Sequence, residues 1–281
     1  MEVSSPVALA EALEELAAFP ETVPLAGGTD LLVALNFGRE RPARLMSLRR
    51  LAELGELEPD GRTRCGAGVT YTQLLAAPID PVLVQAARTV GSPQIRNAGT
   101  VGGNLGTCSP AGDLLPALAA LQATLVLAST AGERRLPLEQ FMRGPKQPDL
   151  RPGELVVTVE WESAGRRQAF LKAGTRNAMV IAAANCALVM DAARRRVGLG
   201  LGSVGPVVIR PEAAERFAEG VLEEARWSLP LLLPESVLAE FGRLAAAAAR
   251  PIDDVRGTAA YRRHVVGLMA RRALERVCAS A

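Results

Sequence analysis

The stretch Gln94–Asp113 most constrains what this chain can fold into and bind. It reads Gln-Ile-Arg-Asn-Ala-Gly-Thr-Val-Gly-Gly-Asn-Leu-Gly-Thr-Cys-Ser-Pro-Ala-Gly-Asp, so glycines and small polar residues dominate it. Glycine and asparagine favour turns, and a strand containing Gly102 and Gly103 would bring few side chains to a core. The composition therefore predicts a loop, neither a helix nor a packed strand, whose backbone N–H groups approach a large anion.

A second segment of the same kind lies upstream at 25–31, with the sequence Leu-Ala-Gly-Gly-Thr-Asp-Leu. We expect the apolar run 31–35 to form a short helix whose N-terminal amides face the glycine turn. Two such loops predict a ligand with more than one phosphate or polar segment. A role as a tight connection explains Gly27 and Gly28 equally well. That explanation is weaker for the longer segment, because it also carries the hydrogen-bonding side chains of Asn104, Thr107, Ser109 and Asp113.

Several familiar sites are excluded. The hexapeptide 200–205 matches the dinucleotide pattern GxGxxG, but Pro206 follows where a helix must begin, so we interpret it as a glycine-rich strand end. The sequence contains no GxxxxGK[ST] stretch. The four cysteines are widely spaced and His264 is the single histidine, which argues against zinc, iron–sulfur and Ser-His-Asp sites. A chain with so few catalytic side chains needs a cofactor to do chemistry.

Composition restricts the partners and the location. The chain has 281 residues, 49% of them hydrophobic and 22% charged, as in ordinary folded proteins. Its net charge of +2 gives no reason to expect nucleic acid as a partner. Apolar runs are shorter than the roughly 18 residues that span a bilayer, and the N-terminus does not resemble a signal peptide. We therefore expect a cytoplasmic protein without a membrane span.

Hydrophobic periodicity predicts alternating helices and strands, with a linker at 165–167. The expected helical segments are 6–18, 31–35, 70–75, 81–90, 114–121, 236–249 and 258–277, and 51–57 is expected to be a short helix or turn. The expected strands are 45–48, 65–69, 124–128, 155–161, 168–173, 180–190 and 196–203. Asp113 directly precedes an apolar helix, so it is either a simple N-cap or an acceptor for ribose or ribityl hydroxyls.

Taken together, the motifs resemble the FAD-binding (medium) subunit of the molybdenum hydroxylases, the family of xanthine dehydrogenase and carbon monoxide dehydrogenase. The resemblance rests on Ala26–Leu31, on 94–104 and on Ser109–Asp113. It extends to Phe170-Leu171-Lys172 with Arg176, and to the tail 253–264. These matches keep their order over nearly the whole chain, which makes them specific as a set.

The resemblance implies an α+β fold. The first part is a two-subdomain PCMH-type FAD-binding domain, like that of vanillyl-alcohol oxidase and the cell-wall reductase MurB. A smaller domain of antiparallel sheet plus helical bundle follows. We place the first domain at 1–163, with its subdomains split near residue 55, and the second at 164–281.

The resemblance also implies FAD as the cofactor and assigns residues to it. One loop wraps the pyrophosphate, through Leu25, Ala26, Gly27, Gly28, Thr29, Asp30, Leu31 and Leu32. A second contacts it from the other side, through Thr100, Val101, Gly102, Gly103 and Asn104. Thr107 and Asp113 hold ribityl or adenosine hydroxyls, and Val156 gives backbone contacts to adenine. Lys172 reaches the isoalloxazine, where an ammonium stabilises reduced flavin; beyond the flavin and this tuning group, no catalytic residue and no metal ligand is implied.

The implied partners are a small subunit with two [2Fe–2S] clusters and a large molybdopterin subunit, assembled as a dimer of heterotrimers. Electrons would pass from the clusters through FAD to NAD+, a quinone or oxygen. Two alternatives remain open. One is a free-standing flavoprotein oxidoreductase with this fold, and the other is a non-catalytic scaffold that has lost FAD.

Overall fold

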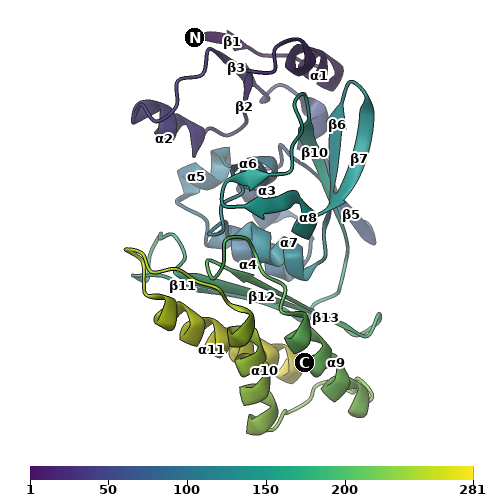
Figure 1. Cartoon of the computed structure of the whole chain (residues 1–281). Helices are drawn as coiled ribbons and strands as arrows, with labels where there is room; N and C mark the ends of the chain where they lie inside the picture. Colours follow the sequence, from purple (N-terminus) through teal and green to yellow (C-terminus); the bar gives the residue numbers. More distant parts are fainter. Residues whose placement is uncertain (281) are drawn as a thin grey trace.

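The computed structural model describes residues 1–280, which form three sections stacked along one axis (Figure 1). The N-terminal section contains a parallel three-stranded sheet in the order β1-β3-β2. Its elements are β1 (Glu2–Ser4), α1 (Leu9–Ala18), β2 (Val23–Leu25), α2 (Leu31–Asn36) and β3 (Arg44–Ser47). Helix α1 buries Ala12, Leu13 and Leu16 in a core shared with the neighbouring section, because it packs beside strand β6.

The middle section is built on an antiparallel five-stranded sheet in the order β4-β5-β10-β6-β7. Its strands are β4 (Leu57–Glu58), β5 (Arg62–Gly66), β6 (Thr124–Ser129), β7 (Gly132–Pro137) and β10 (Leu155–Glu162), with a separate pair β8 (Met142–Gly144) and β9 (Gln147–Pro148). Its helical segments are η1 (Ala52–Gly55), α3 (Tyr71–Ala76), α4 (Pro81–Arg88), α5 (Pro93–Ala98), α6 (Val101–Thr107), α7 (Leu114–Ala120) and α8 (Leu138–Phe141). Thr70, Ser92 and Thr100 fix three of the helix starts, since each side-chain oxygen accepts a hydrogen bond from an amide of the first turn.

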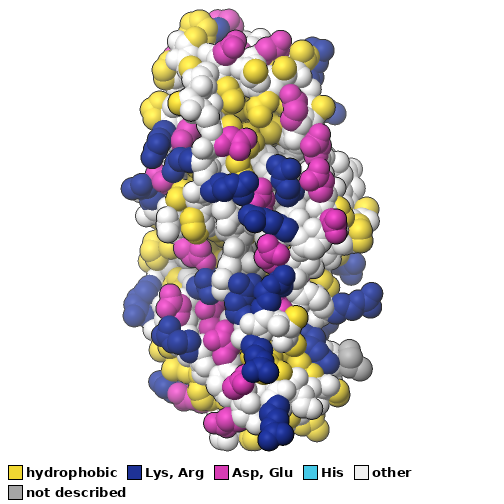
Figure 2. Space-filling model, turned by 90° about the vertical axis from the view of Figure 1, so that its right-hand side faces the viewer, with side chains coloured by type: hydrophobic (Ala, Val, Ile, Leu, Met, Phe, Trp, Pro, Cys, Tyr) yellow, Lys and Arg dark blue, Asp and Glu magenta, His cyan; other side chains and the backbone are white. Residues whose placement is uncertain are grey.

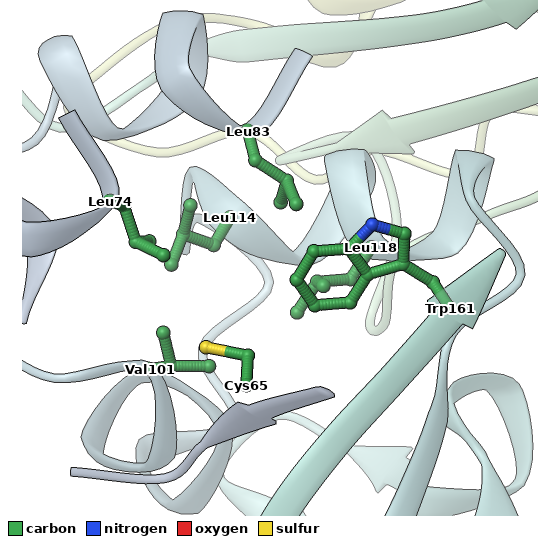
Figure 3. A pocket seen from close by; sticks show the side chains of 7 residues that line it. All are labelled: Cys65, Leu74, Leu83, Val101, Leu114, Leu118 and Trp161. Carbon is green, nitrogen blue, oxygen red and sulfur yellow. The ribbon is translucent and has the colours of Figure 1, made fainter. Parts of the chain in front are cut away.

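The core of the middle section lies between this sheet and helices α3, α4, α6 and α7. Figure 3 shows a small apolar pocket at its centre that leaves no room for a water molecule. Its lining residues are Cys65, Leu74, Leu83, Val101, Leu114, Leu118 and Trp161. All of them are buried, so this pocket is packed core and not a ligand site.

The C-terminal section places the antiparallel sheet β11-β12-β13 between the middle section and a helical bundle (Figure 1). Its elements are β11 (Gln168–Ala173), β12 (Ala184–Asp191), β13 (Arg196–Gly202), α9 (Glu212–Glu224), α10 (Glu235–Ala248) and α11 (Ala259–Ala279). Every residue of β12 is buried, because its side chains alternate between two cores. Ala187 and Val189 join the core of the middle section, whereas Cys186 and Leu188 join that of the bundle.

Glycines on alternate positions of β13 let α7 approach the sheet closely. A Cβ at Gly198 would overlap the carbonyl oxygen of Ala120, and one at Gly200 would overlap that of Pro116. The hexapeptide 200–205 is therefore a strand end used for packing, as its sequence predicts.

The expected α+β class is confirmed, but the prediction for Gln94–Asp113 is wrong in one respect. The segment contains two helices, α5 and α6, where the composition predicts none. Tertiary contacts override the weak helix propensity of Gly102, because its N–H donates to Ala67 O over 2.7 Å and its bare Cα packs on Ala67. The expected element set also lacked strands β1, β2, β4, β7, β8 and β9 and helices α8 and α9.

The surface mixes charges of both signs. On the face shown in Figure 2, Lys and Arg side chains are interspersed with Asp and Glu, in keeping with the net charge of +2. Among residues 1–280, no group of three or more His, Cys, Asp and Glu is arranged to hold a metal ion. In the same part of the chain, no helix has the length and apolar character needed to cross a membrane. All four cysteines are free and buried.

Candidate functional site: two glycine loops and a buried lysine

The two glycine segments, far apart in the sequence, lie against each other in the structure. A Cβ at Gly27 would overlap the carbonyl oxygen of Ala98, and the same Cβ would lie 3.0 Å from Gly99 Cα. Gly28 adopts a positive φ of 69°, a conformation that other residues rarely take. Glycine is therefore required at both positions by the fold itself, and the loop 25–30 and the α5–α6 junction form one surface.

Backbone amides differ between the two sides of this surface. The N–H groups of Val101, Gly102, Gly103 and Asn104 donate to Val69 O, Ala67 O, Thr100 Oγ1 and Thr100 O, respectively. The expected nest of free amides is therefore not found in this segment. By contrast, the amides of residues 26–31 donate to no acceptor within the described chain. These residues are mostly half-buried and belong to the loop and the first turn of α2. The backbone N–H groups that remain free to bind an anion are therefore those of the upstream loop.

Helix α6 instead contributes a face without side chains. A Cβ at Gly106 would meet nothing within 4 Å, and one at Gly103 would meet only Thr100 Oγ1, at 3.1 Å. Gly103 and Gly106 are one turn apart on the same face of α6. Packing within the protein does not require glycine at position 106 and requires it only weakly at position 103. Each glycine nevertheless lowers the stability of the helix by about 1 kcal/mol relative to alanine. Their bare surface suits close approach by a group outside the chain.

A buried ion pair joins the middle section to β11. Lys172 Nζ donates to Asp113 Oδ2 over 2.5 Å and to the carbonyl oxygen of Thr89 over 3.1 Å. Asp113 Oδ2 also accepts from Thr89 Oγ1, and Asp113 Oδ1 accepts from Asn185 Nδ2. The side chains of Lys172 and Asp113 are only 10% and 6% exposed. Two of the three ammonium protons have partners here, which leaves one for a ligand.

The structure argues against one of the two roles considered for Asp113, that of a simple N-cap. The residue occupies the N-cap position of α7, yet its carboxylate makes no capping bond to that helix within residues 1–280. Burial raises the pKa of the Asp113 carboxyl above its ordinary value, and the charge of Lys172 and the hydrogen bonds from Lys172, Asn185 and Thr89 offset part of that rise. Asp113 is therefore a charge partner at the domain interface.

The remaining predicted residues, Asn104, Thr107 and Val156, lie on α6 and β10. The side chain of Asn104 lies against Gly112, since a Cβ there would be 2.8 Å from Asn104 Nδ2. Thr107 is the half-buried last residue of α6. Val156 is buried in β10, beside a bulge. At that bulge, Val157 O accepts from Ala67 N, which links β10 to α6 through the Gly102–Ala67 bond.

The sequence reasoning missed Thr89 and Asn185, which complete the polar cluster around Asp113. Asn185 carries a visible signal, because it is a polar residue in the otherwise apolar run 184–190. Thr89 carries none, since a threonine at the end of a helix has no distinctive pattern. Its contacts depend on the position of α4, which only the folded chain defines.

Two family models match this chain. The FAD binding domain in molybdopterin dehydrogenase matches residues 1–161, and the CO dehydrogenase flavoprotein C-terminal domain matches residues 169–277. The chain belongs to this family of FAD-binding subunits. Its cofactor is therefore FAD, and it is an oxidoreductase subunit.

Individual relatives of this FAD-binding subunit cover almost its full length. The xanthine dehydrogenase FAD-binding subunit of Escherichia coli O157:H7 is 30% identical, over 97% of this chain and 94% of that protein. The carbon monoxide dehydrogenase medium chain of Hydrogenophaga pseudoflava is also 30% identical, over 89% and 87%. Among solved structures, a chain of reconstituted CO dehydrogenase from Oligotropha carboxidovorans superposes with a TM-score of 0.91 at 25% identity, covering 100% and 98%.

The residues present in the FAD-binding subunit fit such a cofactor. FAD carries a pyrophosphate, for which the free amides of 26–31 are suitable donors. The bare face of α6 admits a group at close range, and Lys172 supplies a positive charge with an unused proton. The hydrogen-bond donors and the open space thus lie on two adjacent segments, and the positive charge lies at the domain interface.

Proposed function

We propose that this chain is the electron-transfer subunit of a molybdenum hydroxylase. It would accept electrons from [2Fe–2S] clusters of a small partner subunit and pass them to NAD+, a quinone or oxygen. A large molybdopterin subunit would oxidise the substrate, and the assembly would be a dimer of heterotrimers. The proposal is supported by the family of the chain and by relatives named as FAD-binding or medium chains of xanthine and CO dehydrogenases.

The contact between Gly27 and Ala98 carries the assignment of the cofactor site. It makes one surface from the loop with free amides and the helix with bare glycines. We assign the pyrophosphate to residues 25–32 and 100–104, hydroxyl contacts to Thr107 and Asp113, and adenine to the backbone of Val156. FAD, when bound, supplies the two-electron redox chemistry, and the chain binds, orients and tunes it.

Lys172 is the tuning group in this proposal. Its ammonium is held by Asp113 and Thr89 O at a site shielded from solvent, so its charge acts with little screening. A fixed positive charge beside a flavin favours the reduced form, in which negative charge develops.

The proposed boundaries of the two domains remain 1–163 and 164–281, and the cytoplasmic location remains a prediction from the sequence.

The test is purification of the chain with and without its expected partners. A preparation that retains FAD absorbs at about 450 nm, as oxidised flavins do. Pull-down of the tagged native protein should recover one iron–sulfur and one molybdopterin protein. A yellow chain that turns over a small substrate alone would favour a free-standing flavoprotein, and a colourless chain that takes up no added FAD would favour a scaffold.

A further inference from the structure

Asn185 is a polar side chain placed where the fold otherwise uses apolar ones. It belongs to β12, is 0% exposed, and lies between Ala184 and Cys186. Because strand side chains alternate, it shares the face of Ala187 and Val189, which pack on the middle section. Asn185 therefore points across the domain interface toward Asp113.

Its hydrogen bonds are incomplete on one side. Nδ2 donates to Asp113 Oδ1 over 2.9 Å, whereas Oδ1 has no partner among the described residues. That oxygen faces Gly202, where a Cβ would overlap it. The opposite amide orientation would set an oxygen against a carboxylate, so the charge of Asp113 fixes the orientation. Burying the unpaired side-chain oxygen of Asn185 is unfavourable. The hydrogen bond from its Nδ2 to Asp113 offsets that cost.

The carboxylate oxygens of Asp113 have separate partners. Oδ1 is bound by Asn185, while Oδ2 is bound by Lys172 and Thr89. A carboxylate held at one oxygen presents the other in a defined direction. Asn185 lies directly opposite Lys172 in the register of β11 and β12, yet the ammonium of Lys172 donates to Asp113 and Thr89 and not to Asn185. The hydrogen bonding of the ammonium thus depends on Asn185 through Asp113.

We propose that Asn185 is a positioning residue that orients Asp113 and thereby holds Lys172 at the interface of the two domains. The consequence that Lys172 is presented to FAD rests on the proposed function. The geometry of the three side chains stands without the cofactor.

Loss of the amide donor has a defined effect. Burial already favours the neutral form of Asp113, as its raised pKa records. The other titratable groups nearby are Lys172 and Tyr71, and the pKa of the Tyr71 hydroxyl is itself raised by burial and by the charge of Asp113. Without Asn185, the neutral acid becomes more favourable still, and a neutral Asp113 holds Lys172 less firmly.

Thr and Val at position 185 are a matched pair, since they have nearly the same shape and only Thr keeps a hydroxyl donor. The readout is modification of lysine amines by formaldehyde and borohydride in the full-length chain without FAD, followed by peptide mass spectrometry. The sequence contains only two lysines, and exposed Lys146 is the internal control. We expect Lys172 in N185V to react about tenfold faster than in the wild type, while N185T stays within about threefold, a tenfold change corresponding to 1.4 kcal/mol.

Equal Lys172 reactivity in N185V, N185T and the wild type would overturn the inference, as would equal acceleration in both variants. If N185V does not fold, N185A and N185S repeat the comparison with smaller side chains, and the same two outcomes decide it.

FAD binding is measured on the same preparations. The dissociation constant should rise about tenfold in N185V and little in N185T. A wild-type chain that binds no FAD contradicts the proposed function but leaves the lysine comparison to decide the role of Asn185. A wild-type chain that binds FAD with Lys172 reactivity unaffected by position 185 rejects only the inference.

Discussion

Gln168 Nε2 lies 2.5 Å from Asp80 Oδ1, across the boundary between the FAD-binding domain and the C-terminal domain. Asp80 precedes α4 and is 2% exposed. It also accepts from Trp161 Nε1 over 2.8 Å and from Ala164 N over 3.0 Å, while Gln168 Oε1 accepts from Val82 N. One carboxylate and one amide thereby fix where β11, which carries Lys172, meets α4.

Removal of the Asp80 carboxylate should destabilise the whole chain. D80A leaves Trp161 Nε1 and Ala164 N without an acceptor and removes one of the two acceptors of Gln168 Nε2, so we expect the free energy of unfolding to fall by roughly 3 kcal/mol or more. D80N keeps one acceptor oxygen and should lose less than half of that. Denaturant unfolding followed by circular dichroism measures both, and a D80A chain as stable as the wild type would refute the role of Asp80.

Added bulk on the bare face of α6 should prevent FAD from binding. A valine at Gly103 needs space that we assign to the cofactor, so G103V should weaken FAD binding about tenfold or more while the C-terminal domain stays folded. G220V in α9 is the matched control, since it makes the same change at a helical glycine with open space around it. Flavin content after purification is the measurement, and normal content in G103V would contradict the assignment.

Loss of the Lys172 charge should lower the reduction potential of the bound flavin. K172M removes the positive charge that we propose interacts with the reduced flavin, and we put that interaction at about 1.4 kcal/mol, which equals roughly 30 mV for a two-electron couple. The single change also leaves Asp113 without its cation, so K172M/D113N separates the two effects. Spectroelectrochemical titration gives the potentials, and an unchanged value in both variants would reject tuning by Lys172.

The tail loop before α11 should make stability depend on acid pH. Asp254 Oδ2 accepts from Arg256 Nη2 over 2.7 Å, and Asp254 Oδ1 accepts from buried Arg262. The hydrogen bond from Arg256, together with the one from Arg262, lowers the pKa of Asp254 from 3.8 to about 2. The native state therefore binds its proton more weakly than the unfolded state does, so the stabilisation is complete above pH 3.8 and is lost as the pH falls toward 2.

The measurement for Asp254 is the difference in unfolding free energy between wild type and D254N across pH. Because the carboxylate is 20% exposed, solvent screens part of the interaction, and we expect roughly 1–2 kcal/mol above pH 4 that shrinks toward zero near pH 2. D60N, in the turn between β4 and β5, is the control for a charge change at an exposed site. A difference that stays constant with pH would show that the loop does not depend on the charge of Asp254.

Residue type directed attention to the glycine segments, Asp113 and Lys172, whereas their contacts with FAD were implied by the family resemblance and stay predictions. Paired glycines next to polar residues favour a ligand contact, and a lysine in a chain that otherwise uses arginine is conspicuous. The helical state of 101–107 was not predictable from composition, since it depends on the bond from Gly102 N to Ala67 O. Such a bond is visible only once β5 and α6 are placed together.

Partners of the buried groups were equally hidden from the sequence. Asn185 and Asp113 are 72 positions apart, and nothing local in either segment indicates the other. The location of free amides was also misjudged, because amide bonding depends on which neighbouring carbonyl is close and not on glycine content. Sequence therefore locates the chemistry of this site better than it locates the contacts that orient it.

The order of strands in the five-stranded sheet constrains how the nascent chain folds. Strand β10, residues 155–162, lies between β5 and β6, yet the ribosome makes it after all four other strands. Until it emerges, β5 and β6 lack their shared neighbour, and the backbone N–H and C=O groups along one edge of each strand remain unpaired. Such late, long-range pairing slows folding and exposes strand edges to other chains. Truncation before residue 155 should therefore yield an aggregating fragment, whereas release after residue 162 should allow this sheet to close.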